Sequence, residues 1–417
     1  MKILLINNRH YRGGGADTVY FNTAKLLIDA GHKVVFFSQR DKNNEPCKQE
    51  QYFSERGGRL TQIKHYFYNR DAAKQLEKLI GSEKPDIAHI HLIWGGLSPS
   101  IIDVLKKHQI PVVHTAHDYR MVCPAYLLKD GKGRFCERCK EGKFYNCMLH
   151  RCSKGGLVES LIMTLEMYHR NRCYHPANYI DGFVFVSNFS RNKHFEFDKR
   201  LDKAKTTVLY NCPGEYVLDS LDLTQDTYGS YFLYYGRLSE EKGINTLIKA
   251  FVRYPQLRLK IVGSGPIEEL LQATCTEKGL NNIEILGYKT GKELFDLVVG
   301  AKYVCVPSEC YENNPMTIVE AYSLGTPVIG AAIGGISEVV QDGQTGYLFE
   351  SGSIESMCLA LNKAENIDKD SYLRQKKEAL EFGKKNFSRA AHREHLLAFY
   401  KTVIDEYSYG SSTEGLK

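Results

Sequence analysis

Short apolar runs alternate with longer helix-period segments along the whole chain, and this alternation most restricts the fold. The runs are rich in Val, Ile, Leu, Phe and Tyr, as expected for strands buried on both faces of a parallel sheet. The sequence therefore predicts an α/β fold with two Rossmann-like doubly wound domains. The expected strands are residues 2–7, 33–37, 86–91, 111–116, 182–187 and 206–210 in the first half, and 231–236, 257–263, 282–287, 302–307, 326–331 and 345–349 in the second.

The boundary between the domains is expected in residues 211–230, NCPGEYVLDSLDLTQDTYGS. These residues are turn-rich, and their apolar residues follow neither the helical nor the strand period. We therefore expect an amino-terminal domain of residues 1–212, with a cysteine-rich insertion at 120–155, and a carboxyl-terminal domain of residues 213–388. A terminal helix at 389–409 follows and can pack back on the first domain. An interdomain cleft at the carboxyl ends of the strands is the expected ligand site.

The net charge of +6 is divided unevenly. Residues 1–210 hold 34 Lys and Arg against 21 Asp and Glu, a net charge of +13, whereas the rest holds 21 against 28, a net charge of −7. A basic half indicates an anionic partner, such as a membrane, a phosphorylated acceptor or nucleic acid. A solvated lysine-rich surface explains the charge equally well.

The first residues, MKILLINN, have the pattern of a buried strand and not of a secretion leader, and no stretch approaches 18 consecutive apolar residues. We therefore expect a cytoplasmic protein. In that compartment the 12 cysteines favour free thiols or metal ligands over disulfides.

Two carboxylates, Glu312 and Glu320, flank an expected helix start in ECYENNPMTIVEAYSLGT, residues 309–326. The two asparagines after Glu312 are typical helix caps, Pro315 suits the first helical position, and Gly325 suits the helix end. Eight residues at about 1.5 Å each separate the two acids by about 12 Å at most. Since that is too far to share a proton or a metal ion, we expect the acids to contact different parts of one extended ligand.

Two loops have the composition of phosphate sites. The first strand leads into RHYRGGGADTVYFNTAKLL, where Gly14 and Gly15 open a helix whose amides can bind phosphate. A nicotinamide cofactor would need a third glycine where Thr18 stands, and a plain tight turn is the alternative. In YYGRLSEEKGINTLIKAF, Arg237 and Lys242 lie between a strand end and a helix. That position suits a diphosphate that gains charge as it leaves, although solvated charges are common in such loops.

Together these features describe the site of a nucleotide diphosphate-sugar. The two cations and the amides of residues 314–317 would bind the phosphates. Glu320 would bind the ribose hydroxyls, and Glu312 would bind the sugar. The two acids would then contact opposite ends of one donor.

With these segments the sequence resembles the family 4 retaining glycosyltransferases of GT-B fold, over nearly the whole chain. The most specific part is the Glu-x7-Glu segment ENNPMTIVE followed by AYSLGTPVIGAAIGGISEVVQDGQTGYLF. GRLSEEKG matches the phosphate-binding loop of the family, VGSGP the next strand and turn, and GGGAD the amino-terminal glycine loop.

The resemblance implies that Arg237 and Lys242 hold the diphosphate, that Glu320 holds the ribose and that Glu312 lies by the sugar. It also implies that His117 of TAHDY contacts the sugar from the opposite domain. The donor-binding residues assigned on this basis are Gly14, Gly15, Gly236, Gly263, Asn314, Pro315, Met316, Thr317 and Glu320.

The resemblance further implies a metal-independent enzyme with no catalytic cofactor. It would move a hexose-type sugar from a UDP- or GDP-type donor to a saccharide or a polyprenyl-diphosphate-linked acceptor in surface polysaccharide synthesis. Retention would follow from same-face attack, with the leaving phosphate oxygen helping to deprotonate the acceptor. The Asp-x-Asp formed by Asp368 and Asp370 lies in a polar stretch, and we interpret it as a solvated turn.

Three further residues follow expected strands. His117 lies where such folds bind ligands and has Asp118 beside it, although a histidine there can also simply satisfy a backbone carbonyl. We interpret Asn188 and Asn211 as turn and capping residues that line the cleft.

Five cysteines fall between Cys123 and Cys152. Cys136 and Cys139 form a C-x2-C pair, with Cys147 and a histidine following at zinc-like spacing. Some polysaccharide-building members of the family carry a similar insertion with cysteines at the places of Cys123, Cys136, Cys139 and Cys152. We therefore predict a structural zinc on that quartet, with free thiols as the alternative.

Two other functions fit parts of the sequence. A nucleotide-sugar 2-epimerase has the same fold but needs acids poised for proton abstraction, and we find no such pair near His117. A nucleic-acid-binding protein would use the eight Lys and Arg between Lys129 and Lys154 and the aromatic residues among them. Because that function leaves the second half without a role, we expect no nucleic acid partner.

Residues 155–175, GGLVESLIMTLEMYHRNRCYH, form an apolar-rich helix candidate that ends in basic residues. Such a helix can dock a protein peripherally on the inner membrane face, where a lipid-linked acceptor lies. An ordinary core helix is equally consistent with the sequence.

Overall fold

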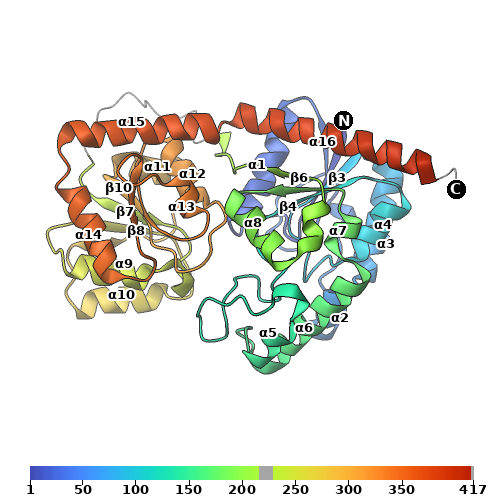
Figure 1. Cartoon of the computed structure of the whole chain (residues 1–417), viewed down its shortest axis with the longest axis horizontal. Helices are drawn as coiled ribbons and strands as arrows, with labels where there is room; N and C mark the ends of the chain where they lie inside the picture. Colours follow the sequence, from blue (N-terminus) through green and yellow to red (C-terminus); the bar gives the residue numbers. More distant parts are fainter. Residues whose placement is uncertain (216–228, 415–417) are drawn as a thin grey trace. The chain divides into compact units, whose positions relative to one another are not determined.

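The computed structural model describes residues 1–215 and 229–414, with side chains described as far as Ser408. Most of the boundary expected at residues 211–230 lies outside the described residues. The chain forms two compact units. Unit 1 is Met1–Leu209 with the chain from Ala390 on, and unit 2 is Tyr210–Arg389. Each has its own sheet and its own apolar core (Figure 1).

The described part of unit 1 contains one parallel sheet in the order β2-β1-β3-β4-β5-β6. Its central strands are buried on both faces, which explains their unbroken apolar sequences. All the strands expected in the first half are confirmed. They are β1 (Lys2–Ile6), β2 (Lys33–Phe37), β3 (Ile87–Ile90), β4 (Val112–Ala116), β5 (Gly182–Phe185) and β6 (Thr206–Val208).

The helices of unit 1 include the last helix of the chain, α16, which runs across this unit (Figure 1). Leu396 and Tyr400 of α16 are buried against the core that surrounds β1. The Tyr400 hydroxyl is also 2.5 Å from His89 Nδ1 in β3. The helices are α1 (Gly15–Asp29), η1 (Glu50–Tyr52), α2 (Arg59–Phe67), α3 (Arg70–Glu83), α4 (Ser100–Lys107), η2 (Lys140–Gly142), α5 (Tyr145–Leu149), α6 (Gly156–Cys173), α7 (Pro176–Tyr179), α8 (Asn188–Phe197), η3 (Lys199–Lys203) and α16 (Arg389–Glu414).

The described part of unit 2 repeats this plan, with a parallel sheet in the order β12-β11-β10-β7-β8-β9. The strands expected in the second half are confirmed as well. β10 and β7 are neighbours at the centre, so the loops that follow them lie at the same edge of the sheet. The strands are β7 (Phe232–Tyr235), β8 (Leu259–Val262), β9 (Ile283–Ile285), β10 (Tyr303–Val306), β11 (Val328–Ala331) and β12 (Gly346–Phe349).

The helices of unit 2 connect these strands and cover the sheet (Figure 1). They are η5 (Glu240–Lys242), α9 (Ile244–Val252), α10 (Glu268–Glu277), α11 (Gly291–Gly300), α12 (Met316–Ser323), α13 (Ile336–Val339), α14 (Ile354–Glu365) and α15 (Lys369–Asn386). Among the helices within residues 1–215 and 229–414, none combines the length and the hydropathy that a membrane span requires.

Two local expectations were wrong, both at helix starts. Asp368 is exposed as expected, but it caps α15 and does not lie in a turn, its carboxylate accepting a hydrogen bond from Ser371 N at 2.9 Å. Ser187, and not Asn188, caps α8. In each case a short polar side chain satisfies an amide that the first helical turn leaves free.

Candidate active site

An ion pair joins the two loops at the centre of the unit 2 sheet edge. Lys242 ends η5, which follows β7, and Glu312 lies in the loop after β10. Lys242 Nζ is 2.6 Å from Glu312 Oε1. Burial by itself would lower the pKa of Lys242, but the charge and hydrogen bond of Glu312, with the nearby Cys310 and Tyr234, together outweigh burial and raise the pKa. Lys242 is therefore a fixed cation at the carboxyl ends of the strands.

The backbone around this pair is closely packed. Gly243 has a φ of 70°, and a Cβ there would lie 1.8 Å from the Pro307 carbonyl oxygen, so only glycine lets η5 approach the end of β10. On the other side, Ser308 Oγ donates to Glu312 Oε1 at 2.8 Å, and Gly335 N donates to the Glu312 carbonyl at 2.7 Å. These contacts fix the carboxylate before any ligand arrives.

Arg237, the second predicted phosphate ligand, is exposed on the same loop, and it forms no ion pair with the described residues. Its backbone is positioned by the two predicted glycines. Gly263 has a φ of 143°, and a Cβ there would lie 1.9 Å from the Gly236 carbonyl oxygen. The turns after β7 and β8 therefore touch through their backbones. The guanidinium of Arg237 is available to an anionic ligand.

The helix start at α12 differs in detail from the expectation. Pro315 is the N-cap, not the first helical residue, and neither asparagine caps the helix. Asn314 instead accepts from Asn211 N with its side chain and from Asn211 Nδ2 with its carbonyl, both at 2.8 Å. Asn211 thus holds the loop that carries Glu312. Met316 and Thr317 begin α12, whose first amides have no partner within the helix.

Glu320 lies inside α12 and is buried, as expected for a side chain that faces the sheet. Burial raises the pKa of Glu320 to about 7, and a hydrogen bond from Tyr235 partly opposes the rise. The Tyr235 hydroxyl has one hydrogen, which it can donate either to Glu320 or to the Thr317 carbonyl, 2.8 Å away. A buried carboxyl with few partners can accept hydrogen bonds from the hydroxyls of a ligand.

In unit 1, the predicted glycine loop lies at a helix start. Gly14 is the N-cap of α1, Gly15 is its first residue, and both are exposed. Asp17, in the first turn, is buried and accepts from Asn7 Nδ2 at 2.9 Å. The loop therefore presents backbone amides to its surroundings, beside a carboxylate that is already engaged.

His117 follows β4 and contacts a second histidine that sequence reasoning missed. His91 Nδ1 and His117 Nε2 are 2.8 Å apart, and the rings stack with centroids 5.0 Å apart. Burial, with a smaller effect of His114, lowers the pKa of His117 to about 3. Burial lowers the pKa of His91 as well. Both rings are therefore neutral at pH 7, and one donates a hydrogen to the other.

The sequence contained a signal for this pair. His91 and His117 both directly follow buried strands, β3 and β4, that are neighbours in the sheet. Side chains at the ends of neighbouring parallel strands lie at one edge. His91 therefore orients the imidazole of His117.

The cysteine cluster is compact. Cys136 N bonds to the Leu128 carbonyl at 2.8 Å, which closes a small hairpin. Burial raises the pKa of Cys123 to about 12, and the thiols of Cys152 and Cys136 add to the rise. Burial also raises the pKa of Cys139, as do the other three thiols of the predicted quartet. Cysteine thiolates are a donor type that zinc takes, so the quartet has suitable chemistry.

Within residues 1–215 and 229–414, however, no three His, Cys, Asp or Glu side chains are arranged so that they could hold a metal ion. The zinc on the quartet therefore stays a prediction.

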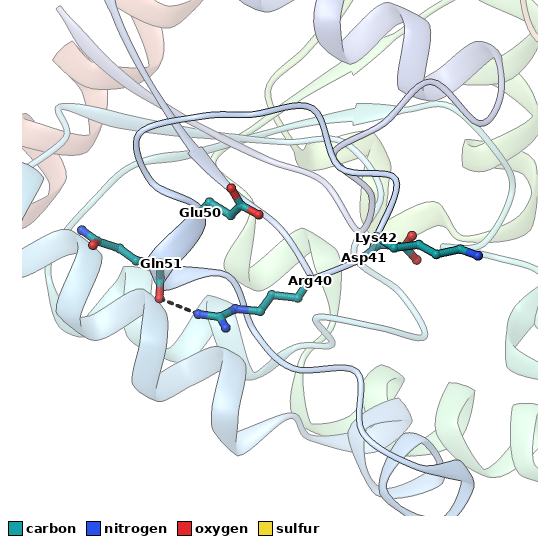
Figure 2. A pocket seen from close by; sticks show the side chains of 5 residues that line it. All are labelled: Arg40, Asp41, Lys42, Glu50 and Gln51. Carbon is teal, nitrogen blue, oxygen red and sulfur yellow. Dashed lines mark hydrogen bonds between the residues drawn. The ribbon is translucent and has the colours of Figure 1, made fainter.

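An open depression of about 550 Å³ lies elsewhere on unit 1, near the loop after β2 (Figure 2). It is lined by Arg40, Asp41, Lys42, Glu50 and Gln51. Arg40 donates to the Gln51 carbonyl at 3.1 Å, and Asp41 is paired with Arg56, so two of the four charged side chains that line the depression have partners within unit 1. None of the predicted site residues lines this depression.

Comparison with known families agrees with this geometry. The model for Glycosyltransferase Family 4 matches residues 13–212, and the model for Glycosyl transferases group 1 matches residues 223–382. Two Rossmann-like domains with these matches define a glycosyltransferase of GT-B fold. The chain belongs to the family 4 glycosyltransferases, which confirms the resemblance seen in the sequence.

Individual relatives are distant. An uncharacterized 42.6 kDa protein in the cps region of Klebsiella pneumoniae is 24% identical over 81% of this chain and 87% of that protein. Lipopolysaccharide 1,2-N-acetylglucosaminetransferase of Salmonella typhimurium is 29% identical, over 47% of this chain and 57% of that protein. The crystal structure of Anabaena HepE with UDP-glucose has a TM-score of 0.69 at 18% identity, covering 96% of this chain and 100% of that chain. Sucrose-phosphate synthase from Thermosynechococcus elongatus has a TM-score of 0.68 at 17% identity, covering 97% and 100%.

The raised pKa of Glu320 predicts a pH-dependent stability. Between its ordinary value of 4.5 and about 7, the folded chain keeps a proton on Glu320 that the unfolded chain has released. Raising the pH through this window should therefore destabilise unit 2, by on the order of 3 kcal/mol in full. Glu320→Gln should remove this loss, measured by urea unfolding at pH 5 and pH 8. Glu284→Gln, at an exposed position of β9, is the control, and an unaltered pH dependence in Glu320→Gln would contradict the assignment.

The cysteine quartet predicts a bound metal. Elemental analysis of protein purified without chelator should find near one zinc per chain, because four thiolates close a tetrahedral site. The zinc should be lost in Cys136→Ser/Cys139→Ser, which should still bind nucleotide. Cys173→Ser, an exposed cysteine outside the quartet, should retain it. A metal-free wild type together with full transfer activity of the double variant would show that the cysteines are bystanders.

Proposed function

We propose that this chain is a retaining, metal-independent glycosyltransferase that uses a UDP- or GDP-type sugar donor. The sugar would be a hexose and the acceptor a saccharide or a polyprenyl-diphosphate-linked saccharide in surface polysaccharide synthesis. The observation that carries the proposal is the pair of cations at one sheet edge. Arg237 is exposed, and Lys242 is held by Glu312 at the ends of two central strands.

The diphosphate is the part of the donor that this edge suits best. A leaving nucleoside diphosphate gains negative charge as the bond from the sugar C1 to the phosphate oxygen breaks. Arg237 and Lys242 would stabilise that charge, together with the first amides of α12, where the helix dipole adds to the effect. With these groups in place, no divalent cation is needed to neutralise the leaving group.

The two acids have separate roles. Glu312 would hold Lys242 in the free enzyme and contact the donor sugar, since its carboxylate lies beside the cation that binds the phosphates. Glu320, inside α12, would accept hydrogen bonds from the ribose hydroxyls. Ionised Glu320 is the better acceptor, so donor binding would favour its deprotonated form.

The transfer step itself would take place on one face of the sugar. The acceptor oxygen forms the new bond to C1 as the bond from C1 to the phosphate oxygen breaks. The acceptor proton passes to the leaving phosphate oxygen, so no protein base is consumed. His117 of unit 1 would contact the sugar as a neutral hydrogen-bonding group, oriented by His91.

The relatives support the choice of donor and pathway. Two of the solved structures with this fold are Anabaena HepE with UDP and with UDP-glucose. A putative colanic acid biosynthesis glycosyltransferase of Salmonella typhimurium, 26% identical over 46% of this chain and 52% of that protein, is named for polysaccharide synthesis. These names favour a nucleotide-sugar donor and a surface saccharide as the acceptor.

The proposal predicts large losses of turnover on removal of either cation or of Glu312. Arg237→Ala, Lys242→Ala and Glu312→Ala should each lower turnover at least about 100-fold, equivalent to about 2.7 kcal/mol of transition-state stabilisation. Nucleotide release from a UDP- or GDP-sugar, measured with chelator present, gives the rates. Arg253→Ala is the control, because Arg253 is an exposed cation of the same unit that follows α9, at the opposite edge of the sheet.

Full activity of Lys242→Ala, or activity of the wild type that requires added magnesium, would contradict this function. Glu320→Gln should behave differently from the other three variants. It should mainly raise the KM for the donor, because a ribose contact is made equally in the ground state and in the transition state.

A further inference from the structure

The polarity of α6 is reversed relative to an ordinary surface helix. Leu157, Leu161, Leu165 and Tyr168 recur at helical spacing on one face, and that face is exposed. Val158 beside them is 70% exposed. A helix that covers a core normally turns its leucines inward and its charges outward. Burial in the core of unit 1 therefore does not explain the leucines of α6.

The face of α6 that packs inward is mostly polar, and Met167 is the apolar side chain among its buried residues. Ser160 and Thr164 are buried there, and the Thr164 hydroxyl donates to the Ser160 carbonyl at 2.8 Å. Arg170 and Glu166 form a buried ion pair with Nε 2.9 Å from Oε1. The Arg170 guanidinium also lies 4.1 Å above the ring of Trp94. Because these charges are paired within unit 1, the helix cannot be turned over without leaving them unpaired.

Two neighbouring helices carry further exposed leucines. α5 and α2 both pack beside α6, and all three lie together in Figure 1. Leu149 at the end of α5 is 61% exposed, and Leu60 of α2 is 78% exposed. We refer to the apolar face of α5 and α6 as the α6 patch; it consists of Leu149, Leu157, Val158, Leu161, Leu165 and Tyr168.

Three basic residues lie close to the α6 patch in the sequence. Arg151 follows α5, Lys154 precedes α6, and Arg172 continues the exposed stripe of α6 by one turn. All three are exposed, and among the described residues they form no ion pair. The exposed acid nearest in sequence, Glu159, is hydrogen-bonded to the Ser153 hydroxyl. The surroundings of the patch are therefore positively charged, in keeping with the net charge of +13 over residues 1–210.

We propose that the α6 patch docks unit 1 on the surface of an anionic lipid membrane. Leucines and a tyrosine along one helix face, with Lys and Arg beside them, are the composition of helices that lie in the membrane interface. The apolar side chains would enter the boundary between headgroups and acyl chains, and the cations would remain among anionic headgroups. A second copy of the chain fits less well, because it would bring like charges together.

The exposure of these leucines argues against one of the two interpretations of residues 155–175. A core helix requires the leucines to be buried, and they are exposed. The proposal goes beyond the transfer reaction and does not depend on it, since the patch shares no residue with the candidate active site.

Flotation with lipid vesicles tests the proposal on the full-length protein. The wild type should float with vesicles of phosphatidylcholine and phosphatidylglycerol at low salt and remain behind with phosphatidylcholine alone. Leu161→Asp/Leu165→Asp should lower the bound fraction at least ten-fold, because it places two charges in the apolar layer. Arg151→Gln/Lys154→Gln/Arg172→Gln should lower binding at low salt and remove most of its dependence on salt.

Leu270→Asp is the matched control, since Leu270 is a similarly exposed leucine on α10 of unit 2, and it should bind like the wild type. Nucleotide release with a soluble acceptor should be unchanged in both patch variants, which separates membrane docking from catalysis and shows that they fold. Absence of binding by the wild type at low salt, or equal binding by Leu161→Asp/Leu165→Asp, would overturn the proposal. A dimer in sedimentation velocity that the same leucine variant abolishes would also overturn it.

Discussion

The ion pair between Lys242 and Glu312 is the interaction on which the candidate site of unit 2 depends. A cation held near the ends of buried strands is costly unless an anion accompanies it. In the free protein Glu312 is that anion, and Ser308 and Gly335 hold it in place. A diphosphate brings its own negative charge and can replace Glu312 as the partner of Lys242. In the proposed function, the pair would keep the site organised before the donor binds and would leave the carboxylate beside the sugar afterwards.

The fold explains why these two residues meet. Lys242 and Glu312 are far apart in sequence but follow β7 and β10, which are adjacent at the centre of a parallel sheet. The same rule brings His91 and His117 together after β3 and β4 in unit 1. In both units, these polar side chains lie at the carboxyl ends of neighbouring strands, which is where open α/β sheets bind ligands.

Much of the fold could be predicted from the sequence, because a strand buried on both faces needs an unbroken apolar run. The partners within the sites were harder to predict. Neither the Lys242–Glu312 contact nor the His91–His117 contact follows from spacing, since each requires the strand order. At α12 the local pattern suggested asparagine caps. Asn314 instead accepts a hydrogen bond from Asn211, which is far away in the sequence. The direction of the leucines of α6 was also undetermined, because helical spacing is the same whether a face points inward or outward.

Titration of UDP or GDP into the two single variants of the ion pair, with chelator present, tests the central claim most directly. If Lys242 binds the diphosphate and pairs with Glu312 only in its absence, Lys242→Gln should weaken nucleotide binding at least about ten-fold, or 1.4 kcal/mol. Glu312→Gln should bind the same nucleotide as tightly as the wild type or more tightly, because it removes the competing carboxylate. Equal weakening in both variants would show that the pair is only structural, and unchanged affinity in Lys242→Gln would show that the diphosphate binds elsewhere.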